Sequence, residues 1–203
     1  MSIYVLKPRF QALLRPTVQR LYVWGVTANQ VTAAACVVSV TLGLWLFFAP
    51  HILFAYAYIA AWMLLRMGFN AIDGMLAREH NQKSPLGAFL NELTDVLSDA
   101  ALYLPFVLVA PFSPFWVGVV ILLAGISEFA GALGQTVGAS RRYDGPLGKS
   151  DRAFVFGALA LYVACDGPLP EWTAWLMPLL AALVAWTIVN RVRAAIAEAS
   201  PGA

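Results

Sequence analysis

Six apolar runs, each about as long as a lipid bilayer is thick, constrain the fold of this chain more than any other feature. A membrane-spanning helix needs about 20 mostly apolar residues. Hydrophobic residues make up 61% of the 203 positions and charged residues only 12%, whereas a soluble domain carries roughly 25% charged residues. The sequence therefore predicts an all-α integral membrane protein, with lipid as the solvent for most of its surface.

Proline, glycine and aspartate separate the six predicted spans, as expected of residues that break helices. The approximate bounds of the spans are 28–49, 52–76, 85–110, 113–138, 150–166 and 171–193. Thr27 and Gln30 resemble a capping box that opens the first span, and Ser84 with Pro85 suits the start of the third. The fifth span has the shortest continuous apolar core. We find no internal repeat and expect one domain over residues 1–203.

The distribution of lysine and arginine predicts how these spans are oriented. Twelve of the thirteen basic residues precede the first span, lie at or near the connections after spans two and four, or close the last span. By the positive-inside rule, both termini face the cytoplasm of a bacterial inner membrane. Residues 3–22 mix aromatic residues and leucine with four basic residues, which predicts an interfacial helix broken near Pro8 and Pro16.

Acidic residues inside the predicted spans indicate a functional site. Leaving aside acids at the ends of the spans, five acidic side chains lie within otherwise membrane-spanning hydrocarbon: Asp73, Glu92, Asp95, Asp99 and Glu128. A charged group at the bilayer centre costs about 2.5–3.5 kcal/mol even on insertion scales, so it is rarely there for structure alone. At about 100° per residue, Arg66, Asn70 and Asp73 form one stripe, and the three acids of the third span share one face. We expect the two stripes to face each other across an antiparallel pair, with the site on the cytoplasmic side.

Oxygen-rich clusters of this kind suit Mg²⁺, Mn²⁺ or Ca²⁺ rather than zinc. Without a cation, crowded carboxylates would repel and some would protonate. With one, the site could hold a pyrophosphate and position an attacking hydroxyl. Basic residues on the same side could bind the phosphates of a donor or an anionic acceptor, or could simply determine topology. These residues are Arg78, Arg141, Arg142, Lys149 and Arg152.

The stretch from residue 70 to residue 95 resembles the signature of the CDP-alcohol phosphotransferase family. That signature reads Asp-x-x-Asp-Gly-x-x-Ala-Arg, then about eight residues, then Gly-x-x-x-Asp-x-x-x-Asp. Here the sequence reads Asn-Ala-Ile-Asp-Gly-Met-Leu-Ala-Arg, then eight residues, then Gly-Ala-Phe-Leu-Asn-Glu-Leu-Thr-Asp. The family's six spans, cytoplasmic termini and N-terminal interfacial helix also fit, so the resemblance covers nearly the whole chain.

This resemblance implies a reaction. Family members displace CMP from a CDP-linked donor, usually CDP-diacylglycerol, by a small alcohol acceptor, using Mg²⁺ or Mn²⁺. The positions that match nucleotide- and metal-binding residues of the family are Asp73, Gly74, Ala77, Arg78 and Gly87. Asp95 matches the family's proposed general base for the acceptor hydroxyl, which makes Asp95 and Asp73 the expected catalytic residues. The family's dimers also make a homodimer the expected assembly.

Two positions depart from the signature, because Asn70 and Asn91 stand where the family has aspartate. An amide oxygen can still bind a hard cation but brings no charge. The expected metal ligands are Asn70, Asp73, Asn91 and Asp95, with Glu92 and Asp99 as possible substitutes. Glu92 and Asp99 could instead form a salt bridge with Arg66. We expect Glu128 to be a structural partner for the core rather than a catalytic residue.

Three functions remain open. The first is a phosphatidyltransferase of phospholipid biosynthesis. The second is a homologue that binds a CDP-lipid or a metal without turnover. The third is a small ion-coupled transporter, which the absence of an inverted repeat disfavours. The net charge of +2 gives no indication of nucleic-acid binding, and Cys36 and Cys165 fall near opposite faces of the membrane, so we expect no disulfide.

Overall fold

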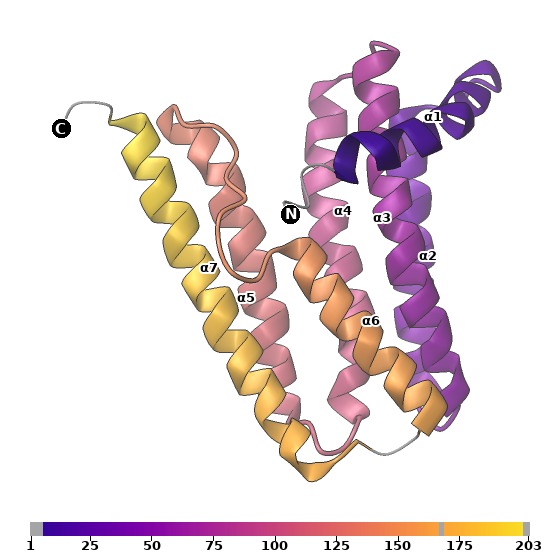
Figure 1. The fold of residues 1–203 in the computed structure, drawn as a ribbon, viewed down its shortest axis with the longest axis vertical. Coiled ribbons are helices and arrows are strands. Elements are labelled where there is room, and N and C mark those ends of the chain that lie inside the picture. The colour runs from indigo at the N-terminus through magenta and orange to yellow at the C-terminus, as the bar shows by residue number, and fades with distance from the viewer. Residues whose placement is uncertain (1–5, 167–168, 201–203) are drawn as a thin grey trace.

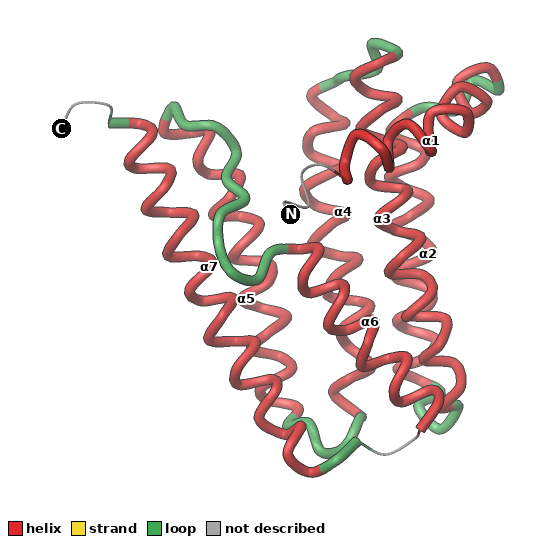
Figure 2. The backbone as a smooth tube through the Cα atoms, viewed as in Figure 1, coloured by secondary structure: helices red, strands yellow, loops and turns green. Residues whose placement is uncertain are grey.

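Helices are the only regular secondary structure in residues 6–166 and 169–200, the ranges that this computed structural model describes (Figure 2). The α-helices are α1 Leu6–Val23, α2 Ala28–Phe48, α3 Tyr56–Glu79, α4 Pro85–Tyr103, α5 Pro114–Leu133, α6 Lys149–Asp166 and α7 Leu176–Ala199. Short 3₁₀ helices adjoin α3, α4, α5 and α7: η2 Leu53–Ala55, η3 Leu104–Leu108, η4 Gly134–Val137 and η5 Glu171–Trp175. Helices α2 to α7 form a bundle, and α1 lies across one end of it (Figure 1).

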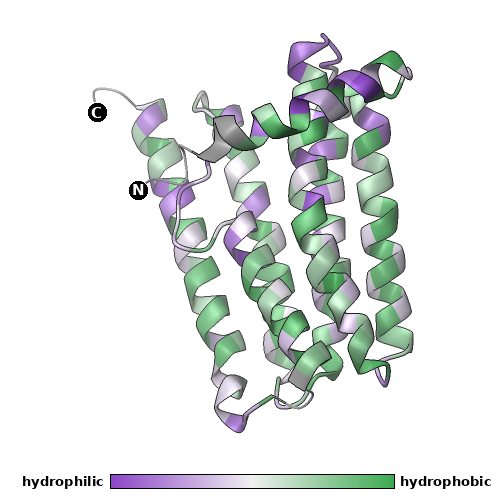
Figure 3. Ribbon diagram, turned by 45° about the vertical axis from the view of Figure 1, so that its right-hand side comes forward, coloured by the Kyte–Doolittle hydropathy of each residue, from purple (hydrophilic) through white to green (hydrophobic). Residues whose placement is uncertain are grey.

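The prediction of an all-helical chain is confirmed for the described residues, and each predicted span corresponds to one long helix, which in four cases adjoins a 3₁₀ turn. Three helical segments are long and apolar enough to cross a membrane: Ala28–Phe48, Pro114–Val137 and Glu171–Ala199. Hydrophilic residues gather towards the end of the bundle where α1 lies, and hydrophobic residues dominate the other end (Figure 3).

Helix α1 runs without a break from Leu6, so the prediction of breaks near Pro8 and Pro16 is wrong. Pro8 falls in the first turn, where a backbone N–H has no partner within the helix in any case. Pro16 lies inside α1 and removes one hydrogen bond without ending the helix. Residues 3–5 of the predicted interfacial helix lie outside the described residues.

Two contacts fasten α1 to the end of α3. The guanidinium of Arg15 pairs with the carboxylate of Glu79 over 3.1 Å. The ring of Tyr22 stacks on that of His80 with 3.9 Å between centroids. Both partners lie just where α3 ends, so α1 is held close to the turn that joins α3 to α4.

The predicted caps of α2 and α4 are both present. The hydroxyl of Thr27 accepts from the backbone N–H of Gln30 over 3.2 Å, and the Gln30 side chain accepts from the Thr27 N–H over 2.9 Å. The hydroxyl of Ser84 accepts from the N–H of Gly87 over 3.0 Å. These caps fix where both helices begin, and both beginnings lie at the end of the bundle that α1 covers.

Arg66 on the predicted stripe of α3 pairs with Asp95 and Asp99 of α4, so the two stripes face each other as predicted, although the two helices are not closely packed. Helix α2 packs extensively against both of them, and α3 packs against α6. Gly43 makes the α2–α4 approach possible, because a Cβ atom there would collide with the backbone carbonyl of Ala101. The faces of α3 and α4 that carry the signature are therefore separated by a gap that only long side chains bridge.

The connection between α5 and α6 descends into the bundle before α6 begins (Figure 1). Gly138 and Gly145 adopt positive φ angles of 85° and 129°, which suit glycine. The N–H of Leu147 donates to the hydroxyl of Thr187 in α7 over 3.1 Å. Because this connection covers part of the depth of the bundle, α6 is short, which explains why the fifth predicted span has a short apolar core.

Candidate active site

A cavity of about 630 Å³ opens between the beginnings of α2 and α4, the end of α3 and the α5–α6 connection. Most of the signature lines it, through Asp73, Gly74, Ala77, Arg78, Gly87 and Asn91. Gly87 has to be small, because a Cβ atom there would lie 2.8 Å from the side-chain oxygen of Asn29. The gap between α3 and α4 thus becomes a polar cavity with signature residues on two of its walls.

Asp73 is a buried carboxylate at the wall of this cavity, with 6% of its surface exposed. The hydroxyl of Thr32 in α2 donates to its Oδ2 atom over 2.8 Å. Asn91 lines the same cavity from α4. The structure therefore brings one acidic and one amide position of the signature together around one space.

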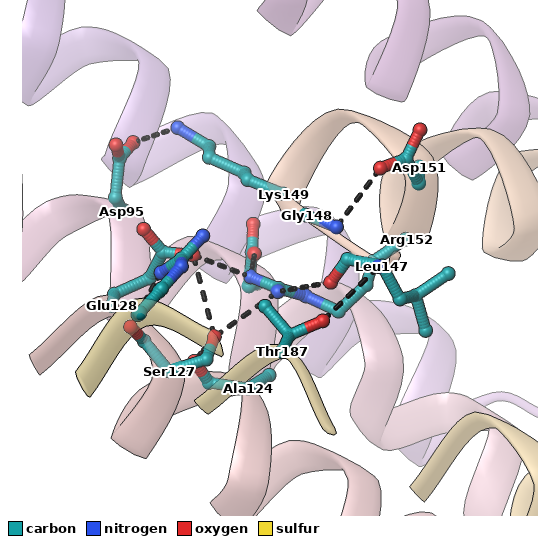
Figure 4. Close-up of polar contacts among 12 residues, drawn as sticks. Asp95, Ala124, Ser127, Glu128, Leu147, Gly148, Lys149, Asp151, Arg152 and Thr187 are labelled. Carbon is teal, nitrogen blue, oxygen red and sulfur yellow. Dashed lines mark hydrogen bonds and ion pairs between the residues drawn. The ribbon is translucent and has the colours of Figure 1, made fainter. Parts of the chain in front are cut away.

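Asp95 is held by two cations and does not line the cavity. The Lys149 ammonium forms an ion pair with Asp95 Oδ1 (Figure 4). Arg66 Nη2 lies 3.3 Å from the same oxygen and donates to the Asp95 backbone carbonyl over 3.2 Å. Asp73 is close enough for its charge to interact with those of Asp95 and Lys149. The predicted catalytic pair is therefore close, with one member at the cavity and the other behind it.

Asn70 is separated from the other predicted metal ligands that line the main cavity. It lines a second cavity of about 120 Å³ between α3 and α6, together with Arg66, Lys149 and Ser150. The structure thus divides the two asparagines that replace signature aspartates, because Asn91 faces the larger space and Asn70 the smaller one.

Glu92 and Asp99 are both engaged by arginines. Glu92 accepts two hydrogen bonds from Arg141, over 2.6 and 2.7 Å. Asp99 is paired with Arg66 and, over 3.3 Å, with Arg152. No group of three histidine, cysteine, aspartate or glutamate side chains is close enough to hold a metal ion within the described ranges. Asp99 therefore has the predicted partner Arg66, whereas Glu92 has a different one.

The basic residues divide into those that face the cavity and those that do not. Arg78 and Arg141 line it, as does Lys83. Arg152 is almost fully buried, with 1% exposed. Arg142 turns away from the cavity and pairs with Asp144 over 2.8 Å and with Glu198. Its hydrogen bonds hold the pKa of Asp144 below the ordinary value.

Sequence reasoning missed several residues of the cavity wall, including Thr32 and Tyr143, and the extent of a buried network around Glu128. Thr32 and Tyr143 line the cavity, but a threonine in an apolar span and a tyrosine in a loop carry no periodic signal. Glu128 contacts three arginines, which confirms the expectation of a structural partner but not its extent. The only relevant sequence signal is that Arg141, Arg152 and Arg191 are all predicted on the same side of the membrane as one another.

The model of the family described as CDP-alcohol phosphatidyltransferase matches residues 25–189. The chain belongs to the CDP-alcohol phosphatidyltransferase family. Its sequence is 45% identical over 200 residues to the inner membrane protein YnbA of Escherichia coli (strain K12), and the alignment covers 97% of each chain. Membership of a CDP-alcohol phosphatidyltransferase family supports a phosphatidyl-transfer activity in phospholipid biosynthesis.

Two solved structures of the phosphatidylinositol phosphate synthase PgsA1 from Mycobacterium tuberculosis share this fold. Both have a TM-score of 0.71 and 24% sequence identity to the chain. The complex with manganese and citrate aligns over 89% of this chain and 88% of that one, and the structure with CDP-DAG bound over 89% and 92%. At this identity the likeness shows that the CDP-alcohol phosphatidyltransferase chain has the fold of PgsA1.

Proposed function

We propose that the chain transfers a phosphatidyl or related substituted phosphate group from a CDP-linked donor to an alcohol acceptor and releases CMP. The observation that carries this proposal is the cavity whose walls bring together both halves of the signature, with Asp73 and Asn91 on facing helices. CDP-diacylglycerol is the proposed donor, supported by the CDP-DAG bound to the structurally similar PgsA1.

The cavity wall suits the nucleotide and diphosphate of such a donor. Gly74, Ala77 and Gly87 leave space beside the backbone where larger side chains would project into it. Arg78 and Lys83 bring positive charge to the same wall, and arginine binds phosphate oxygens with two parallel hydrogen bonds. The diphosphate would therefore lie near the end of α3.

A single hard divalent cation fits the oxygen atoms at this cavity. Mg²⁺ commonly binds through one or two carboxylates and completes its shell with water and substrate phosphates. Asp73 supplies a buried carboxylate and Asn91 an amide oxygen, so these two residues would hold the ion. When bound, it would neutralise charge on the phosphates. Support comes from the manganese in a PgsA1 structure; the choice between Mg²⁺ and Mn²⁺ stays open.

Asp95 would accept the proton of the acceptor. The acceptor oxygen forms a new bond to the phosphorus of the phosphatidyl group, and the bond from that phosphorus to the CMP oxygen breaks, so that CMP leaves with the bonding electrons. Lys149 and Arg66 form ion pairs with the Asp95 carboxylate and fix its position. Removing the proton from the hydroxyl would make the oxygen a better nucleophile.

We further propose that the six predicted spans cross a bacterial inner membrane, with both termini and the cavity on the cytoplasmic side. The distribution of basic residues supports this orientation, and the relative YnbA is an inner membrane protein. Helix α1 exposes Leu13 and Val23 at 75% and 74%, which supports an interfacial position. The homodimer stays a prediction.

A second candidate is a protein that binds a CDP-lipid without turnover. The observation that favours it is the position of Asn70, which faces a different cavity and lacks the charge of the family's aspartate. In that case CDP-diacylglycerol would bind in a metal-dependent way, and no acceptor would release CMP.

The test is CMP release from CDP-diacylglycerol by the purified protein, with Mg²⁺ or Mn²⁺ and a panel of hydroxyl acceptors. We expect release that is abolished by EDTA and lowered at least about 100-fold by Asp73→Ala, since a metal contributes several kcal/mol to such reactions. CDP-diacylglycerol binding without release by any acceptor would support the second candidate. Full turnover by Asp73→Ala would refute the proposed role of Asp73 in holding the metal ion, and it would also refute the second candidate.

A further inference from the structure

Three arginines from different parts of the chain converge on one buried carboxylate. Glu128 is 4% exposed. Arg152 of α6 approaches its Oε1 atom to 2.9 Å (Figure 4), and Arg191 of α7 approaches the same atom to 3.4 Å. Arg141 of the α5–α6 connection approaches Oε2 to 3.3 Å. An arrangement of guanidinium groups around one anion is the way proteins bind phosphates and carboxylates.

This cluster offers more hydrogen-bond donors than Glu128 uses. The Nε atoms of Arg152 and Arg191 are buried and have no hydrogen-bond partner among the described residues. A carboxylate has two oxygens, whereas a phosphate group presents three or four. The two arginines that contact Glu128 Oε1 therefore each keep one buried hydrogen-bond donor unused.

The site is closed towards the cavity by one residue. Arg141 lines the cavity and is the only one of the three arginines to do so. Its guanidinium bonds to Glu92 on the cavity side and to Glu128 on the buried side. Arg141 thus separates the arginine site from the space where the substrates would bind.

No net positive charge is left for an incoming anion. The three guanidinium groups are balanced by three carboxylates, because Glu92 pairs with Arg141, Asp99 with Arg152, and Glu128 with all three arginines. Arg66 and Lys149 add two further cations, and these are offset by Asp95, which pairs with both of them, and by Asp73, whose charge interacts with that of Lys149. Among the described cavity residues, Arg78 and Lys83 form no ion pair, and both lie where the donor diphosphate is proposed.

We propose that Glu128 is a built-in anion that fills the three-arginine site, and that the acceptor is consequently an alcohol without a phosphate group. This inference rests on the proposed transferase function and adds the chemical class of its acceptor. A phosphorylated acceptor would have to approach Glu92 and Glu128 with no uncompensated cation to receive it. An uncharged alcohol requires no such cation and meets no like charge.

Glu128→Gln tests the site directly, because it removes the charge while keeping the size of the side chain. The first readout is the binding of inorganic phosphate, measured as the thermal shift of the purified protein in detergent. We expect Glu128→Gln to bind inorganic phosphate at least 10-fold more tightly than the unaltered protein. Glu171→Gln, an exposed position on η5, is the matched control and should bind phosphate like the unaltered protein.

The second readout compares acceptors in the CMP-release assay, glycerol against glycerol 3-phosphate and inositol against inositol phosphate. We expect the unaltered protein to use the unphosphorylated alcohol at least 10-fold better in each pair, and Glu128→Gln to narrow that ratio. Glu128→Asp, which keeps the charge, should retain the preference even if folding of the glutamine variant is impaired.

Two results would overturn the inference: a preference of the unaltered protein for the phosphorylated acceptor, or equal phosphate binding with and without the Glu128 charge. Failure of the transferase function itself gives a different pattern. In that case no acceptor releases CMP, yet phosphate binding by Glu128→Gln still shows whether Glu128 fills an anion site.

Discussion

The hydroxyl of Thr32 donates a 2.8 Å hydrogen bond to the carboxylate of Asp73, and so joins α2 to α3 at the wall of the cavity. This bond occupies Oδ2 and fixes the direction of the carboxylate. Partners that orient a ligating side chain commonly matter 10–100-fold for metal affinity or activity. Thr32 is therefore part of the candidate site even though no charge marks it in the sequence.

We expect Thr32→Val to lower metal-dependent CMP release about 10-fold and to raise the metal concentration needed for half-maximal rate, since second-shell partners have effects of this size. The measurement is a metal titration of the release rate. Thr41→Val, at an exposed position of the same helix, is the control and should behave like the unaltered protein. Equal metal dependence in both variants would show that the Thr32 hydroxyl does not orient Asp73.

Arg66 should be important for stability as well as for Asp95. It is 5% exposed and pairs with Asp99 and Asp95. Removing one partner of a buried ion pair costs about 3–5 kcal/mol, and Arg152 remains beside Asp99, so we expect Arg66→Met to fall near the lower end of this range. Thermal unfolding in detergent measures the loss.

The control for this experiment is Arg193→Met, because Arg193 is exposed on α7 and surface charges contribute little. Arg66→Lys keeps the charge, so its unfolding temperature should lie between those of Arg66→Met and Arg193→Met. A change in unfolding temperature as small for Arg66→Met as for Arg193→Met would contradict the buried network.

The close approach of α2 and α4 can be tested with a single methyl group. A Cβ atom at Gly43 would collide with the carbonyl of Ala101, whereas one at Gly118 in α5 meets nothing within 4 Å. We expect Gly43→Ala to destabilise the protein by about 1–3 kcal/mol, the usual cost of overpacking. Gly118→Ala should be neutral or slightly stabilising, because alanine favours helix. Equal stability of the two variants in denaturant titrations would mean that α2 and α4 are further apart.

The α5–α6 connection should loosen in acid. Hydrogen bonds from the backbone N–H and hydroxyl of Ser140, aided by Arg142, lower the pKa of Glu198. A group with a lowered pKa stabilises the folded state above its ordinary value, about 4.3 for glutamate, and the contribution is lost as the pH falls through the lowered value. Hydrogen exchange of residues 139–143, corrected for intrinsic rates, should therefore increase below about pH 4.

In Glu198→Gln, residues 139–143 should exchange faster already at neutral pH. Their exchange rate, corrected for intrinsic rates, should change little further when the pH falls below about 4. Asp144→Asn removes the neighbouring carboxylate but leaves the Ser140–Glu198 bonds, so it serves as the matched control. Protection of residues 139–143 that is the same at pH 7 in Glu198→Gln and in the unaltered protein would exclude this role of Glu198.

The sequence predicted the helices and the signature residues of the cavity well, because both depend on short-range patterns. Hydrophobic run length located the helices, and the spacing from Asp73 to Gly87 placed the signature on both sides of one turn. The prediction of a break in α1 is wrong because Pro16 was expected to end the helix. In the structure α1 continues through Pro16, and its contacts with α3 stabilise it.

The pairing of acids with bases could not be read from the sequence. Glu92 meets Arg141 across 49 positions of the chain, and Asp99 meets Arg152 across 53. Such pairs depend on which helices are neighbours, and the sequence did not indicate that α2 packs against both α3 and α4. The same arrangement separates Asn70 from Asn91 although both belong to one motif.

The buried charge network also has a direction along the chain. Asp99 and Glu128 are synthesised before Arg141, Arg152 and Arg191, so in the proposed six-span topology the carboxylates of α4 and α5 would enter the membrane ahead of most of their counter-charges. An unpaired charge in hydrocarbon is costly. In that topology the insertion of α4 and α5 would be completed only when α6 and α7 arrive, which would make the last helices of the chain a condition for the stable assembly of the earlier ones.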